Sequence, residues 1–218
     1  MITLITIGQT PREDLMKAFN LGGVMDAQLI GALDKVSLDE ISMLEKLPGE
    51  EKLYVVLKSG MANINHEIIE QKVEKLITEY AASSEAIALL CMSEFKCTSN
   101  QTKVVYPIKE MKEKVRDITH NDTTIIFVPI KEQLESAKIK WDSVEGKKHF
   151  VAVHPKSESV LDEISRKINL YNSNHVILDC YGYEFELVDE IEKKHQCACY
   201  NAQESVVKKI KDVINEYK

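Results

Sequence analysis

The 218-residue sequence lacks the motifs and segments by which several large classes of protein are recognised. It contains no G-x-G-x-x-G, no G-x-x-x-x-G-K-[ST] and no G-x-S-x-G, which mark dinucleotide sites, phosphate-binding loops and serine hydrolases. No apolar run approaches the ~18 residues that a membrane-spanning helix needs. The first residues carry neither a basic stretch nor a long apolar segment, so we expect no secretory signal peptide and a cytoplasmic protein.

An excess of positive charge is also missing, since 28 Lys and Arg residues stand against 35 Asp and Glu residues and the net charge is -7. Without a basic stripe we expect no nucleic-acid or membrane partner, and a small molecule is favoured instead. The five cysteines are an odd number in a chain without an export signal, which favours reduced thiols over a disulfide framework. Composition leaves open whether the chain forms a homodimer.

Two short apolar runs, each followed by a cysteine, are the most informative feature of the sequence. Residues 87–90 (IALL) precede Cys91, and residues 176–178 (VIL) precede Asp179 and Cys180. Such runs are typical of strands buried on both faces, as in parallel sheets covered by helices. The cysteines then lie at the carboxyl-terminal edge of the strands, where open α/β sheets bind ligands. Both thiols are therefore candidates for chemistry.

The surroundings of the two cysteines also repeat. A strand at 53–57 and a helix-period segment at 64–80 precede the Cys91 strand, as a strand at 150–153 and a helix-period segment at 157–171 precede the Cys180 strand. Repetition of this kind predicts an α/β fold of two similar lobes with parallel sheets flanked by helices. Two such lobes would be related by a pseudo-twofold axis that lets the cysteines face each other.

We expect the first lobe to comprise residues 1–100 and the second lobe residues 101–202. A strand at 104–106 and a helix from 107 to about 118 would begin the second lobe. The segment 203–218 has the apolar period of an amphipathic helix, and we expect it to pack back on the first lobe.

The first strand leads into a turn and a helix start. Thr10 is predicted to cap this helix, with Pro11 at the first helical position and Glu13 completing a T-x-x-E capping box. The simplest interpretation is that the whole turn serves to start the helix. Arg12 is harder to explain, because a cation in the first turn opposes the helix dipole. Binding of an anionic ligand beside Arg12 would explain why a cation stands at this position.

For Cys91 and Cys180, the simplest interpretation is that both are buried as small hydrophobic side chains. Their matched placement favours a functional one. Two thiols flanking a carbon acid can remove a proton from one face and return a proton to the other, which is racemisation or epimerisation without a cofactor. Donors for the carbanion would be Ser93, Arg12 and the backbone N–H groups after each cysteine. Ser93 is equally explained as a turn residue.

A metal site is a weaker hypothesis. His195, Cys197 and Cys199 could lie on one face of an extended segment, but ligands roughly 7 Å apart along a strand are too widely spaced for one ion. We therefore expect no metal, and interpret these cysteines as core residues on a short strand. The sequence assigns no role to Cys97.

With these residues in view, the chain resembles the AroM family, which is placed in the aspartate/glutamate racemase superfamily. The most specific match is the segment 6–14 (TIGQTPRED), which is similar to the N-terminal signature of that family. Shorter matches span most of the chain: Leu33-Asp34, Leu89-Leu90-Cys91, Glu94-Phe95, Val128-Pro129, Glu132-Gln133, Lys140-Trp141 and Ile177-Leu178-Asp179-Cys180.

The resemblance implies a cleft between two α/β lobes, lined by one cysteine from each. Ser93 is similar to the hydroxyl residue that, in racemases of the superfamily, follows the first cysteine and helps to hold the substrate carboxylate. The second site departs from the pattern, because Tyr181 and Gly182 stand where many of those racemases have threonine. The candidate substrate-binding residues are Gln9, Thr10, Arg12, Ser93, Tyr181 and Gly182.

Three hypotheses follow for the function. The first is a cofactor-independent racemase or isomerase acting beside the carboxylate of a small acid, or a one-thiol variant such as a decarboxylase or a cis-trans isomerase. The second is a non-catalytic carboxylate-binding or regulatory protein that retains the racemase-like cleft. The third is a redox sensor, which would require the two sulfurs to come close enough for a disulfide.

Overall fold

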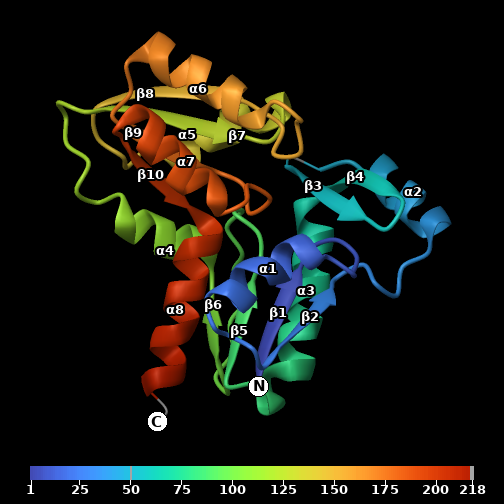
Figure 1. Ribbon diagram of the computed structural model, residues 1–218. Coiled ribbons are helices and arrows are strands. Elements are labelled where there is room, and N and C mark those ends of the chain that lie inside the picture. The colour runs from blue at the N-terminus through green and yellow to red at the C-terminus, as the bar shows by residue number, and fades with distance from the viewer. Residues whose placement is uncertain (50, 217–218) are drawn as a thin grey trace. The chain divides into compact units, whose positions relative to one another are not determined.

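A computed structural model describes residues 1–49 and 51–216 (Figure 1). The chain forms two compact units, one made of residues 1–106 and the segment from Val206 onward, and the other of residues 107–205. Both are α/β structures built on a four-stranded sheet. No helix of the described residues is long and apolar enough to cross a membrane.

The first unit contains a parallel sheet with the strand order β2-β1-β5-β6. The strands are β1 (Ile2–Thr6), β2 (Ala27–Gly31), β5 (Ala86–Leu89) and β6 (Lys103–Val105). Every residue of β1 and of β5 is buried, as is typical of central strands that are covered on both faces. The strand that the sequence assigned to the start of the second lobe is β6, which pairs with β5 and so lies in the first unit.

The helices of this unit are α1 (Glu13–Leu21), α2 (Leu38–Lys46), α3 (His66–Tyr80), the short 3-10 helix η1 (Ala81–Ser83) and most of α8 (Ala202–Glu216). A full capping box, formed by Ser37 and Glu40, starts α2. Gly22, at the end of α1, lies so close to α8 that a Cβ atom there would be 2.3 Å from Cγ1 of Val207. The C-terminal helix therefore covers part of the first unit.

The strand expected at 53–57 does not belong to the parallel sheet. It is β3 (Lys52–Leu57), which pairs antiparallel with β4 (Gly60–Asn65) in a separate two-stranded hairpin. The predicted helix at 64–80 consequently begins at His66, after the Asn65 side chain has accepted a hydrogen bond from the N–H of Glu67.

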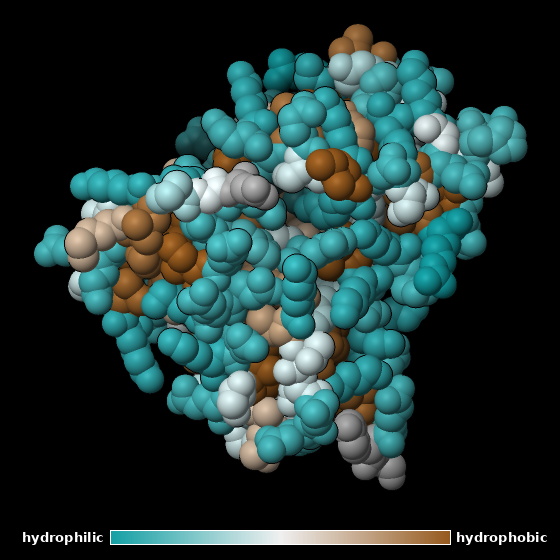
Figure 2. All heavy atoms as spheres, turned by 180° about the vertical axis from the view of Figure 1, so that it is seen from behind, coloured by the Kyte–Doolittle hydropathy of each residue, from teal (hydrophilic) through white to brown (hydrophobic). Residues whose placement is uncertain are grey.

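The hairpin packs with α2 and leaves apolar side chains exposed. Figure 2 shows apolar atoms gathered over this part of the first unit. Large hydrophobic side chains with exposed fractions of 44–59% there are Leu38, Met43, Leu47 and Met61. A strand within a covered parallel sheet would not present such a surface.

Gly8 is the position at which the hairpin meets the end of β1. A Cβ atom on Gly8 would lie 2.0 Å from the carbonyl oxygen of Val56, which belongs to β3. Gly8→Ala should therefore force the hairpin away and lower the free energy of unfolding by about 1–3 kcal/mol. Urea unfolding measures this loss. Ser59→Ala, in the exposed hairpin turn, is the matched control and should change stability by less than about 0.5 kcal/mol; equal effects would contradict the contact.

The second unit contains a parallel sheet with the order β10-β9-β7-β8. Its strands are β7 (Thr123–Val128), β8 (Lys147–Ala152), β9 (His175–Leu178) and β10 (Ala198–Asn201). Its helices are α4 (Pro107–Lys114), η2 (Lys131–Gln133), α5 (Leu134–Lys140), α6 (Val160–Tyr171), α7 (Glu186–His195) and the first residues of α8. Trp141, which follows α5, is fully buried.

The two sheets have the same topology. In each, the first strand of the unit is flanked on one side by the second strand and on the other by the third and then the fourth. The prediction of two similar α/β lobes with parallel sheets is thus confirmed, although the repeat differs from the one expected: β8 corresponds to β2, and β3 has no counterpart. The pseudo-twofold axis and the cleft between the lobes stay predictions.

Candidate functional site

Cys91 and Cys180 occupy equivalent positions in the two sheets. Leu89 pairs with Ile5 of the first strand of its unit, and Leu178 pairs with Phe127 of the corresponding strand. Leu90 donates its N–H to the Ile5 carbonyl at 2.8 Å, and Asp179 donates to the Phe127 carbonyl, also at 2.8 Å. Each cysteine follows directly and is half-buried. The same backbone geometry therefore carries both thiols beyond the carboxyl-terminal edge of a parallel sheet.

Thr10 lies at the same edge of the first sheet, but it does not cap α1. This helix begins at Glu13, and no side chain caps it. The Thr10 N–H and hydroxyl both donate to Asp34, at 2.6 and 2.8 Å, and the N–H of Gly31 donates to the same carboxylate at 2.7 Å. Thr10 therefore hydrogen-bonds to Asp34 instead of capping α1. Through these bonds Asp34 connects the segment after β1 to the end of β2.

Gln9 connects three segments at this edge. Its side-chain N–H groups donate to the carbonyls of Leu33 and Val36, at 3.0 and 3.1 Å. Its Oε1 accepts the N–H of Lys58 at 3.2 Å, and its own N–H donates to Val56 at 3.0 Å. The side chain is buried. Gln9 thus fixes the backbone around the candidate site by contacts within the protein.

Arg12 occupies the position just before α1 instead of its first turn. Its Nε and Nη2 donate to the two carboxylate oxygens of Asp14 at 2.8 and 2.7 Å. The Arg12 side chain is only 13% exposed. This bidentate pair accounts for the cation that the sequence left unexplained, while the Nη1 edge of the guanidinium lies outside the pair.

The loop after Cys91 contains Ser93, which is half-buried, and is anchored to α3. His66 Nε2 lies 3.0 Å from the carbonyl oxygen of Glu94, and Glu70 accepts the N–H of Lys96 at 2.5 Å. Burial and the nearby Glu70 carboxylate raise the pKa of Cys97 to about 11, so this thiol stays protonated at neutral pH. Cys97 is therefore a packing residue of the loop.

The loop after Cys180 is built differently. The N–H of Gly182 donates to Cys180 Sγ at 3.3 Å, so a backbone donor already faces this sulfur. Tyr181 is buried and its hydroxyl makes no hydrogen bond to the described residues. Tyr183 donates its hydroxyl to the carbonyls of Val128, the last residue of β7, and Val153, which follows β8. The loop following β8 lies alongside, since a Cβ atom on Gly182 would be 3.4 Å from Pro155.

A buried ion pair lies directly before Cys180. Lys140 Nζ, at the end of α5, is 2.8 Å from Oδ1 of Asp179, whose side chain is 0% exposed. Burial raises the pKa of the Asp179 carboxyl, while Lys140, the Trp141 indole N–H and Lys112 act in the opposite direction. The motifs Lys140-Trp141 and Asp179-Cys180, far apart in sequence, thus meet in the second unit.

The cysteines near the C-terminus belong to the core. Cys197 and Cys199 are both buried in the hydrophobic cluster of the second unit, with Val176 and Ile191 among its members. Burial raises the pKa of both thiols. Among the described residues, no three His, Cys, Asp or Glu side chains are grouped so that they could hold a metal ion.

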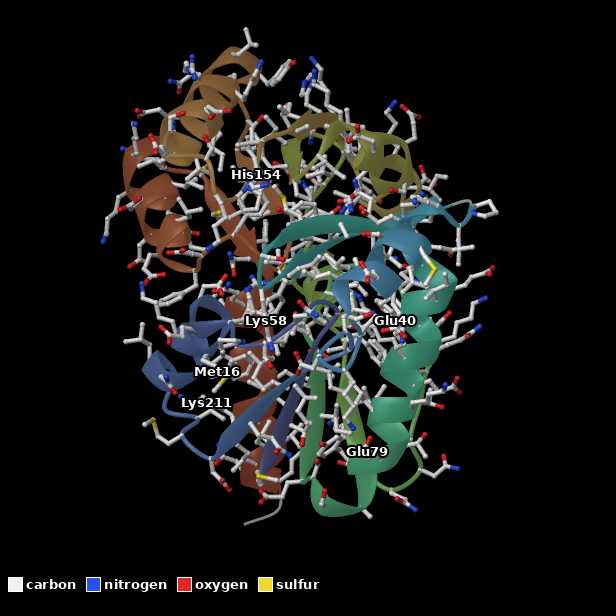
Figure 3. All side chains as sticks on the ribbon, turned by 90° about the vertical axis from the view of Figure 1, so that its right-hand side faces the viewer. Met16, Glu40, Lys58, Glu79, His154 and Lys211 are labelled. Atoms are coloured by element: carbon white, nitrogen blue, oxygen red, sulfur yellow. The ribbon has the colours of Figure 1, made fainter. Side chains whose placement is uncertain are left out.

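Sequence reasoning missed Lys58, because β3 was expected inside the sheet. Lys58 lies in the exposed turn of the hairpin, and its backbone is held against Gln9 at the end of β1 (Figure 3). Asp34 and Lys140 were named only as parts of matching motifs. The spacing in sequence carried no signal of these contacts, since each depends on how distant segments meet.

The comparisons with known proteins agree with this architecture. The sequence profile of the family described as AroM protein matches residues 2–214. No curated protein matches the sequence.

Several solved structures are similar in fold. The allantoin racemase from Klebsiella pneumoniae has a TM-score of 0.59 and 9% identity, with 99% of this chain and 88% of that chain covered. The glutamate racemase from Francisella tularensis, solved in complex with D-glutamate, has a TM-score of 0.56 and 14% identity over 99% and 81%. The aspartate racemase from Picrophilus torridus has a TM-score of 0.56 and 13% identity over 97% and 94%.

At these identities the solved structures establish a shared fold alone. The family match covers nearly the whole chain, including both cysteines and the N-terminal signature. The chain belongs to the AroM protein family.

Proposed function

We propose that this protein is a cofactor-independent racemase or related isomerase that acts beside the carboxylate of a small acid, with Cys91 and Cys180 as the two proton-transfer groups. The observation that carries the proposal is the equivalent position of the two thiols, each directly after the residue that extends the third strand of its sheet. Packing alone gives no reason for cysteine to recur at a half-buried position of this kind.

In the proposed reaction, the thiolate of one cysteine removes the proton from the carbon next to the carboxylate. The C–H electron pair passes into the carboxylate as an enediolate, and an S–H bond forms. The thiol of the other cysteine then donates its proton to the opposite face of the carbon and becomes the thiolate. Ser93 and the backbone N–H groups after each cysteine are the proposed donors to the developing charge.

The test is exchange of solvent deuterium into the protein's substrate. A panel of amino, hydroxy and dicarboxylic acids is incubated with the protein in deuterium oxide, and incorporation next to the carboxylate is followed by NMR together with optical rotation. The proposal expects deuterium and inversion for at least one acid. Inversion of an acid without incorporation of deuterium would count against two-thiol proton transfer. The absence of both inversion and deuterium incorporation across the whole panel would also count against it.

The alternative is a non-catalytic carboxylate-binding protein, which is favoured by the engagement of Arg12 with Asp14 and by Tyr181 at the position after Cys180. A carboxylate that raises the melting temperature of the wild type and of both cysteine variants equally, without any exchange, would support it.

Lys58 is proposed to bind the substrate carboxylate, since the Arg12 guanidinium is already paired and the hairpin holds Lys58 at the edge that carries Cys91. Lys58→Met should raise the KM of the acid found by exchange by about 10- to 100-fold, with kcat nearly unchanged, because a charge-assisted hydrogen bond is lost. Steady-state kinetics measures both constants. Lys35→Met, another exposed lysine of the same unit, is the control; if it has the same effect, Lys58 has no specific role.

A further inference from the structure

The positions that precede the two equivalent cysteines differ in charge. In the first unit this position is Leu90, and in the second it is Asp179, although both donate the same backbone hydrogen bond. A carboxylate replaces a leucine at a site of which only 2% is exposed. Such a replacement is costly unless the charge is paired, so the residue needs an explanation beyond packing.

The partner is Lys140, and the pair is not fully satisfied. Oδ1 accepts from Lys140 at 2.8 Å, while Oδ2 makes no regular hydrogen bond to the described residues. The Trp141 indole N–H is close enough to stabilise the carboxylate without forming such a bond. The Lys140 side chain is 16% exposed, so most of this ion pair is shielded from solvent beside the Cys180 backbone.

Several other charged or titratable groups of the second unit lie near Asp179, near Tyr183 or in the loop after β8. Burial raises the pKa of Asp179, and Lys112 of α4 lowers it. Burial also raises the pKa of Tyr183, and the nearby Cys180, Asp179 and Glu163 of α6 raise it further. The loop after β8 adds His154, whose Nδ1 accepts the N–H of Lys156, and Lys156 in turn pairs with Glu184 at 3.1 Å. Among these groups, only Asp179 adjoins Cys180 in the chain and is fully buried with a cation.

We propose that the buried Asp179–Lys140 pair is a positioning device that sets the charge state of Cys180 and so makes it chemically unlike Cys91. Its use in turnover rests on the proposed function, because two-thiol proton transfer begins with one thiolate and one thiol. Lys140 favours the thiolate and Asp179 disfavours it, so the charge state of Cys180 depends on both members of the pair. At the equivalent position before Cys91 stands Leu90, whose side chain carries no charge.

The two halves of the pair should therefore have opposite effects on the sulfur. Asp179→Asn removes one negative charge beside Lys140, so the net charge near Cys180 becomes more positive and favours the thiolate. Lys140→Met removes the cation and leaves a carboxylate or a neutral acid, so the thiolate loses its support. Two unit charges about 12 Å apart, at an effective dielectric constant of about 20, already change a protonation equilibrium by about tenfold, and closer charges change it by more. A purely structural role would move both variants in the same direction.

The experiment is alkylation of the full-length protein by iodoacetamide at several pH values, with each cysteine quantified by mass spectrometry of its peptide. Cys180 should react about tenfold faster than wild type in Asp179→Asn and about tenfold slower in Lys140→Met at neutral pH. Cys91, measured in the same sample, should stay within about twofold. Lys140→Arg, which keeps the charge, should restore the wild-type rate.

Equal rates in all variants, or changes of the same sign in Asp179→Asn and Lys140→Met, would overturn the proposal. If Lys140→Met does not fold, a faster Cys180 in Asp179→Asn with a normal rate in Lys140→Arg supports it, and any other pattern refutes it. Alkylation needs no turnover, so absence of deuterium exchange would refute the proposed function and leave this result intact.

Discussion

Cys91→Ser and Cys180→Ser should each reduce deuterium exchange and racemisation by at least about 10³-fold. A hydroxyl does not ionise near neutral pH, whereas a thiol has a pKa near ~8.5, so serine can neither remove the proton nor return it at a useful rate. General acid and base catalysis by a positioned group contributes about 10²- to 10⁴-fold, and the two-thiol route needs both groups. Rates of deuterium uptake and of inversion, measured by NMR and polarimetry, test this.

The matched control is Cys97→Ser, since Cys97 is a buried packing residue whose sulfur lies 3.6 Å from the Glu70 carbonyl oxygen. Serine can keep that contact, and exchange should stay within about threefold of wild type. Retained exchange without inversion in either variant would contradict the predicted loss of exchange, and would show that the remaining thiol exchanges the proton on its own face of the carbon. Full activity without Cys180 would indicate one-thiol chemistry.

Breaking the Asp179–Lys140 pair should cause the largest loss of stability of any single change at the site. Lys140→Met leaves an unpaired carboxylate at a fully buried position, which costs about 3–5 kcal/mol at neutral pH. Because burial raises the pKa of Asp179 above its value in the unfolded chain, the protonated form favours the folded state. The variant should therefore be more stable at acidic pH and lose stability as the pH rises, as followed by urea unfolding.

Two further variants separate burial from charge. Lys140→Met combined with Asp179→Leu removes both charges and should recover most of the loss. Lys138→Met breaks the exposed pair with Glu135 on the same helix, at 2.6 Å, and should cost less than about 1 kcal/mol. A loss in Lys138→Met as large as that in Lys140→Met would mean that α5 is sensitive to any substitution and that the buried pair has no special role.

The sequence predicted the strands that carry the cysteines because an uninterrupted apolar run is a local signal of a doubly covered strand. It did not predict the hairpin, since residues 53–57 have the same apolar character and periodicity does not reveal which strand is the partner. The repeated order of strand, helix and cysteine-bearing strand correctly predicted two lobes. One strand of that repeat, residues 53–57, nevertheless pairs in the hairpin and not in the parallel sheet.

The N-terminal signature was misread for a related reason. Thr10 has the right spacing for a helix cap, but Asp34, distant in sequence, receives its N–H and hydroxyl. Arg12 was left without a structural explanation because the sequence placed it in the first turn of the helix, where a cation opposes the dipole. Arg12 and Asp14 meet because Arg12 precedes the helix. Contacts set by tertiary structure were thus the part that local patterns could not supply.

The assignment of the segment from Val206 onward to the first unit bears on how the chain folds as it is synthesised. Val206, Ile210 and Val213 are buried, so the unit that is translated first lacks part of its hydrophobic covering until the whole of the second unit has been made. Domains usually fold in the order in which they emerge from the ribosome. Here residues 107–205 can complete their core first, and the N-terminal half must await the end of α8, exposing apolar surface that chaperones could bind in the meantime.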